Sequence, residues 1–127
     1  MSSNNFKTAV PVIASLDVVN TVGYFERVLG FEREWIWGDP PVYAGLRAGS
    51  AMLYISYDPE LAGAIRERNL APDIYLWVED IHEIYGRHRA SNAEIVDDLG
   101  VKPWGTQQYT VLEPNGYRLK IAQFKNK

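Results

Sequence analysis

Residues 17–31 read DVVNTVGYFERVLGF, and this stretch is the clearest structural signal in the chain. Asp17 is of a type that caps helix N-termini, and glycine, here Gly30, is preferred just past a helix C-terminus. Between them, four apolar side chains recur at helical spacing: Val18, Val22, Phe25 and Leu29. The stretch therefore predicts an amphipathic helix that ends at Gly30 and buries one face.

Segments with the character of β-strands flank this helix on both sides. Residues 9–14 are apolar and rich in β-branched side chains, which is typical of a buried strand. After the helix come three more strand candidates, at residues 31–37, 42–46 and 51–57. Turn residues separate them, GDPP at 38–41 and AGS at 48–50. The first half thus predicts the order strand, helix, then three strands.

The same order returns in the second half, after a charged segment at residues 58–69 that we expect to be a linking helix or loop. Residues 73–78 are strand-like, and Asp80 is a second N-cap, which predicts a helix after it. Further strand candidates follow at residues 94–96, 107–112 and 117–124, the last two joined by the turn sequence EPNG at 113–116. We predict one α+β domain made by duplication, with module one at about residues 8–57, a linker at 58–71 and module two at about 72–125.

Composition narrows the functional classes. The chain has 127 residues, a formal net charge of −3 and no cysteine. The acidic balance weighs against nucleic acid as a partner, and the lack of cysteine excludes disulfides and thiolate chemistry. The polar start, MSSNN at residues 1–5, has no signal-peptide core, and no segment is apolar enough to span a membrane. We therefore expect a cytoplasmic protein with neither a membrane nor a nucleic acid as partner.

Four segments, in this order, resemble the vicinal oxygen chelate superfamily of glyoxalases, bleomycin resistance proteins and extradiol dioxygenases. They are YFERVLGF at 24–31, LYIS at 53–56 followed by residues 73–85, WG at 104–105, and EPNGYR at 113–118. The last departs from the family pattern at Glu113, where Asp is usual, and at Tyr117, where Asn is usual. The resemblance is closest to the bleomycin resistance branch. It implies two βαβββ modules that curl a mixed sheet into a cup with helices outside, and a homodimer whose clefts hold the ligand against aromatic rings.

The same resemblance allows a test for a metal site. Metal-dependent members carry His or Glu at four strand positions, which read Val10, Leu53, Asp73 and Lys120 here. One possible ligand remains, and a lysine would place a positive charge where the ion would sit. The only histidines are six residues apart on one predicted helix, His82 facing solvent and His88 at the boundary between helix and sheet. We predict no metal and no other cofactor.

Aromatic side chains are the candidate ligand contacts. Trp35 and Trp37 share strand parity, so both rings project to one face, as do Tyr75 and Trp77. Core packing is the competing interpretation for any single ring. Lys120 either pairs with Asp73 or reaches the wet rim of the cup. The predicted ligand-binding set is Trp35, Trp37, Tyr43, Leu53, Asp73, Tyr75, Trp77, Trp104, Arg118 and Lys120.

No motif of a hydrolase nucleophile or a phosphate loop is present, and the adjacent Asp97 and Asp98 would point to opposite sides of an extended chain. The leading hypothesis is a metal-free binding protein that sequesters a small organic ligand, an antibiotic or another planar aromatic molecule. Two alternatives stay open. One is a glyoxalase-like lyase, isomerase or dioxygenase with an atypical site, and the other is a structural dimer with a vestigial cup.

Overall fold

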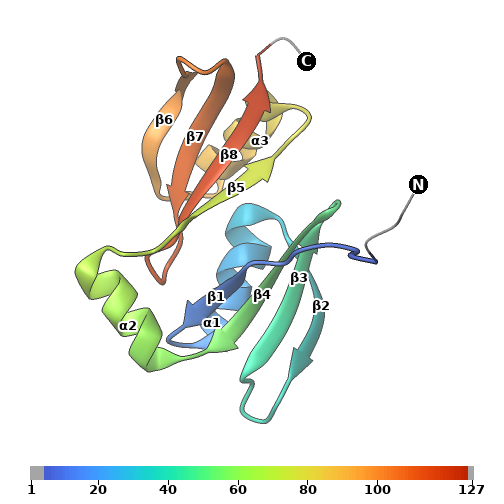
Figure 1. Cartoon of the computed structure of the whole chain (residues 1–127), viewed down its shortest axis with the longest axis vertical. Helices are drawn as coiled ribbons and strands as arrows, with labels where there is room; N and C mark the ends of the chain where they lie inside the picture. The colour runs from blue at the N-terminus through green and yellow to red at the C-terminus, as the bar shows by residue number, and fades with distance from the viewer. Residues whose placement is uncertain (1–4, 126–127) are drawn as a thin grey trace.

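The computed structural model describes residues 5–125 and contains two modules with the same order of elements (Figure 1). Module one consists of β1 (Val12–Ser15), α1 (Val18–Tyr24), η1 (Phe25–Leu29), β2 (Glu32–Trp37), β3 (Tyr43–Ala48) and β4 (Ala51–Tyr57). Helix α2 (Pro59–Arg68) leads to module two, which consists of β5 (Asp73–Trp77), α3 (Ile81–Ala90), β6 (Ile95–Val101), β7 (Thr106–Leu112) and β8 (Arg118–Phe124). Residues 1–4, which hold most of the polar start, lie outside the described range.

Each module builds one mixed four-stranded sheet, so the predicted α+β fold of two βαβββ modules is confirmed. The strand orders are β1-β4-β3-β2 and β5-β8-β7-β6. In both sheets the first strand pairs in parallel with the last, and the other neighbours are antiparallel. No helix within residues 5–125 is long and apolar enough to cross a membrane.

The predicted helix caps are present. Asp17 accepts a hydrogen bond from the Asn20 N–H at 3.1 Å, and Asp80 accepts one from the Glu83 N–H at 3.2 Å. Gly30 ends the first helix in the left-handed conformation at φ 81°, a conformation that glycine adopts without strain. The last five residues of that helix form the π-helical segment η1, and the Phe31 N–H reaches back to the Phe25 carbonyl at 2.9 Å.

One strand prediction was too short. The segment expected at residues 94–96 is the seven-residue strand β6, which runs to Val101 and includes Asp97 and Asp98. Aspartate and glycine are poor strand formers, so the sequence pattern fades after residue 96. The structure accommodates them with two irregularities in the β6–β7 register, between Ile95 and Asp97 and between Asp97 and Gly100.

The hydrophobic core lies between the sheets and their helices and includes residues of both modules. Its largest fully buried apolar side chains are Ile13, Phe25, Leu46, Leu53, Ile55, Ile81, Tyr109, Leu119 and Ile121. The opposite face of each sheet carries no helix of its own module, and the exposed aromatic side chains gather there. We call these two surfaces the open faces.

Candidate ligand-binding site

On module one, three rings form a cluster on the open face. Ring centroids lie 5.4 Å apart for Trp35 and Tyr43, 5.3 Å for Trp35 and Tyr54, and 5.9 Å for Tyr43 and Tyr54, all edge to face. Strand register explains the cluster, because Trp35 is opposite Gly45 and Gly45 is opposite Tyr54. We call Trp35, Tyr43 and Tyr54 the aromatic triad.

The triad depends on a glycine. A Cβ atom at Gly45 would lie 2.4 Å from the Trp35 ring, so the indole lies directly against the backbone there. Trp35 is 37% exposed and Trp37 is 69% exposed. Trp37 shares the open face, as predicted, but stacks on no ring within residues 5–125. Trp35 is thus a packed residue with one accessible side, whereas Trp37 is a free surface group.

On module two, three rings stack in parallel. The Tyr75 and Trp77 centroids lie 5.7 Å apart at 19°, and those of Trp77 and Phe124 lie 4.8 Å apart at 14°. We call Tyr75, Trp77 and Phe124 the aromatic ladder, and all three rings are substantially exposed. Sequence reasoning missed Phe124, although its even spacing from Lys120 on β8 was the available signal.

A charged pair extends the ladder. Lys120 Nζ lies 3.0 Å from Asp73 Oδ2, with side chains 28% and 48% exposed. The sequence allowed Lys120 either to pair with Asp73 or to reach the rim of the cup, and the structure has the pair. Arg118 lies at the same edge and donates to Asn69 Oδ1 at 2.8 Å. The open face of module two thus offers stacking area beside fixed charges.

The placement of Leu53 among the predicted ligand contacts was wrong. Leu53 is fully buried in the core, on the helix side of β4. Because side chains alternate along a strand, its neighbour Tyr54 takes the place on the open face. In the parallel strand pairs, Val12 of β1 is opposite Tyr54 of β4, just as Tyr75 of β5 is opposite Lys120 of β8. The equivalents of Asp73 and Lys120 in module one are therefore Val10 and Tyr54.

The residues do not suit a metal ion. Of the four equivalent positions, only Asp73 carries a ligand group, and it is paired with Lys120. Within residues 5–125, no group of three or more His, Cys, Asp or Glu side chains is placed to hold an ion.

Trp104 belongs to neither aromatic group. It lies between β6 and β7 and is 62% exposed. No ring contact in the described range joins the triad to the ladder.

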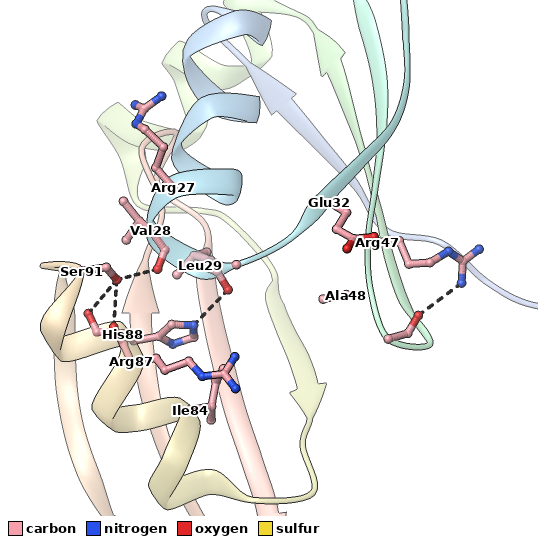
Figure 2. A pocket seen from close by; sticks show the side chains of 12 residues that line it. Arg27, Val28, Leu29, Glu32, Arg47, Ala48, Ile84, Arg87, His88 and Ser91 are labelled. Atoms are coloured by element: carbon pink, nitrogen blue, oxygen red, sulfur yellow. Dashed lines mark hydrogen bonds between the residues drawn. The ribbon is translucent and has the colours of Figure 1, made fainter.

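Both histidines lie where the sequence predicted. His82 is exposed and His88 is buried. His88 Nε2 lies 3.2 Å from the Leu29 carbonyl oxygen, and Nδ1 lies 2.7 Å from the Tyr109 hydroxyl. Burial lowers the pKa of His88, so the ring is neutral, donating from Nε2 and accepting at Nδ1. Figure 2 shows the hydrogen bond between His88 and the Leu29 carbonyl beside the one from Ser91 Oγ to the Val28 carbonyl, which measures 2.6 Å.

The turn between β7 and β8 forms a second connection between the modules. The buried Glu113 side chain accepts from the N–H groups of Asn115 and Tyr117, at 2.8 and 3.1 Å. Asn115 Oδ1 in turn accepts from the Leu16 N–H of module one at 3.0 Å. Burial raises the pKa of Glu113 to about 7, and the N–H donors oppose this shift only in part. We interpret this network as structural, because its side chains are buried and join the β7–β8 turn to module one.

A family model described as the glyoxalase/bleomycin resistance protein/dioxygenase superfamily matches residues 10–121. No curated protein matches the chain. Among solved structures, TioX from Micromonospora sp. ML1 is similar at 25% identity and a TM-score of 0.79, covering 94% of this chain and 99% of that one. A bleomycin-binding protein complexed with bleomycin is similar at 21% identity and 0.78, covering 93% and 98%. The bleomycin-binding protein from Streptomyces verticillus, with copper(II)-bleomycin, is similar at 23% and 0.74, covering 94% and 97%.

Proposed function

Because the chain belongs to the glyoxalase/bleomycin resistance protein/dioxygenase superfamily, we propose that it binds a small planar organic ligand against its open faces without a metal ion. The observation that carries this proposal is the aromatic ladder. Its three rings are nearly parallel, at 19° and 14°, and remain accessible. Parallel exposed rings provide stacking area for a flat molecule, and stacking contributes about 0.5–1.5 kcal/mol per ring pair beyond area burial.

The charges beside the ladder support a polar ligand rather than a purely apolar one. Lys120 and Asp73 already satisfy each other, so the pair can offer one donor and one acceptor without leaving a buried charge unpaired. A small-molecule site commonly combines apolar walls with a few such polar anchors. An antibiotic with a planar ring system and hydrogen-bonding groups fits this description, and sequestration of such a compound would require no catalytic step.

A homodimer is part of the proposal. The triad and the ladder lie on separate sheets, and Trp37, Trp77 and Phe124 on the open faces are 69%, 53% and 49% exposed. Association of two chains through the open faces would bury this aromatic surface and enclose a ligand between sheets. The cytoplasmic location predicted from the sequence also belongs to this proposal.

The experiment is a titration of the purified protein with metal-free bleomycin and a panel of planar natural products. Binding is measured by calorimetry and by tryptophan fluorescence. We expect one binding event that Trp77→Ala weakens about two- to twelvefold, which corresponds to the loss of one stacking contact. Tyr57→Ala is the matched control, because Tyr57 is an exposed aromatic on the helix side of β4. If both variants bind as the wild type does, the ladder is not the site. If no planar compound binds, the proposed function is wrong.

A further inference from the structure

A cleft separates the two modules on the side that faces away from the open faces. It has a volume of about 430 Å³. One wall is the end of η1 with the β3–β4 turn, and the other is α3 (Figure 2). Its two walls are joined by the hydrogen bonds from His88 to Leu29 and from Ser91 to Val28. These hydrogen bonds therefore fix the two walls of the cleft relative to each other.

An apolar recess of about 90 Å³ continues from this cleft. Leu29, Ala48, Ile84 and His88 line both spaces, so the two share a boundary. The recess is otherwise mainly aliphatic, with Phe31, Leu76, Val78 and Ile121 among its walls. Its small volume and apolar lining suit a short alkyl group. His88 offers no free polar atom there, because both ring nitrogens are already hydrogen-bonded.

Arginine side chains are concentrated along the cleft, although the net charge of the protein is −3. Three arginines line it, Arg27, Arg47 and Arg87, against the single acid Glu32. Figure 2 shows Arg87 reaching from α3 into the space below Leu29, whereas Arg27 and Arg47 project away from it. Arg47 is paired with Glu34 at 2.6 Å, which leaves Arg87 as the cation placed to meet a ligand.

Arg87 can exchange its present partner. It is paired with Glu83 one helical turn away at 2.8 Å, with side chains 64% and 59% exposed. Exposed pairs of this kind are weak, and a carboxylate can accept two parallel hydrogen bonds from a guanidinium. A ligand anion at the mouth would therefore displace Glu83 at little cost.

We propose that this cleft is a second binding site, which takes an amphipathic anion with a slender alkyl group in the recess and a carboxylate at Arg87. The site is independent of the ladder, because an alkyl carboxylate has no ring to stack. The Trp77 ring, which belongs to the ladder, lies on the opposite side of β5 from Leu76 of the recess.

The test uses octanoate as the probe, with octylammonium as the control of equal chain length and opposite charge. Binding is followed by amide chemical shifts in a ¹⁵N-labelled sample. We expect octanoate to bind with a dissociation constant on the order of 0.1–1 mM and to shift the amides of Gly30, Gly49 and Ile84. Octylammonium should bind about tenfold more weakly or not at all.

Two variants test the two halves of the site. Arg87→Gln should weaken octanoate binding about tenfold, because it removes a charge-assisted hydrogen bond. Ala48→Leu should weaken it by narrowing the recess, while Arg89→Gln, an exposed arginine on the same helix that does not line the cleft, should leave it unchanged. The proposal is overturned if octanoate shifts none of the cleft amides, if octylammonium binds equally well, or if Arg87→Gln binds like the wild type.

Discussion

Lys120 Nζ lies 3.0 Å from Asp73 Oδ2, on the parallel neighbours β8 and β5. The pair occupies two of the four strand positions at which metal-dependent members of the superfamily hold their ion. The other two positions, by the register of module one, are Val10 and Tyr54. A cation therefore already neutralises the one carboxylate, and the remaining side chains are an aliphatic group and a phenol.

The first prediction concerns metal content. After dialysis against a weak chelator, we expect less than about 0.1 equivalent of zinc, nickel, iron or manganese per chain, because one carboxylate cannot hold a divalent ion tightly. Elemental analysis by mass spectrometry measures this. Lys120→Met frees Asp73 but adds no ligand, so this variant should also remain metal-free. A stoichiometric ion in the wild type would contradict the prediction.

The second prediction concerns Trp35 and Gly45. Gly45→Ala should destabilise the fold by roughly 1–3 kcal/mol, because the new Cβ would meet the indole at 2.4 Å. In a Trp35→Ala background the same change should cost much less, since the obstructing ring is gone. Urea unfolding of the wild type, both single variants and the double variant measures this coupling. If the losses in the free energy of unfolding of the two single variants add up to that of the double variant, the Trp35 ring does not obstruct a Cβ at position 45.

Trp37→Ala is the matched control for this cycle. Trp37 is 69% exposed within one chain and contacts no ring in the described range, so its removal should change the free energy of unfolding by less than about 0.5 kcal/mol at protein concentrations low enough to keep the chain monomeric. A larger loss would place Trp37 in a packed environment.

The third prediction concerns the pH dependence of stability. Burial raises the pKa of Glu113 from 4.5 to about 7, so between these values the folded state binds more protons and stability falls as pH rises. Burial lowers the pKa of His88 below 6.5, so below this value the unfolded state binds more protons and stability falls as pH falls. The two effects oppose each other just below pH 6.5, each contributing at most roughly 1.4 kcal/mol per pH unit.

Two variants separate these contributions. Glu113→Gln should leave the histidine effect, so stability should rise as the pH approaches 6.5 from below. His88→Gln should leave the carboxyl effect, so stability falls with pH from 5 to 7. Urea unfolding at pH 5, 6 and 7 measures both slopes. Equal slopes in the two variants would show that other groups control the pH dependence.

The fourth prediction concerns assembly. We expect a homodimer at micromolar concentrations, because the open faces leave Trp37, Trp77 and Phe124 accessible to water. Multi-angle light scattering measures the mass. Trp37→Asp should shift the equilibrium toward monomer, whereas a charge at the exposed Leu61 on α2, outside both open faces, should not. A monomer mass for the wild type across this range would refute the prediction.

Local signals in the sequence predicted much of the fold. Asp17, Asp80 and Gly30 mark helix ends because capping is a property of a few neighbouring residues. Strand parity likewise placed Tyr75 and Trp77 on one face with Asp73, and the ion pair with Lys120 is one of the two arrangements predicted for that lysine.

Other features depend on register or on distant contacts, which one sequence does not specify. Leu53 was assigned to the wrong face because a motif match off by one residue reverses the side of a strand. The contact of Trp35 with Gly45 depends on a register shift between Arg33 and Trp35. The roles of His88 and Asn115 arise only when the second module folds against the first.

The hydrogen bonds at the end of η1 bear on how the chain folds. The Val28 and Leu29 carbonyls are satisfied by Ser91 and His88, which follow 63 and 59 residues later. A helix terminus that obtains its partners from so far along the chain is incomplete until the second half has been synthesised and has folded. Nascent module one would expose these carbonyls and its share of the common core. The two modules are therefore one cooperative unit, and thermal unfolding should follow a single transition.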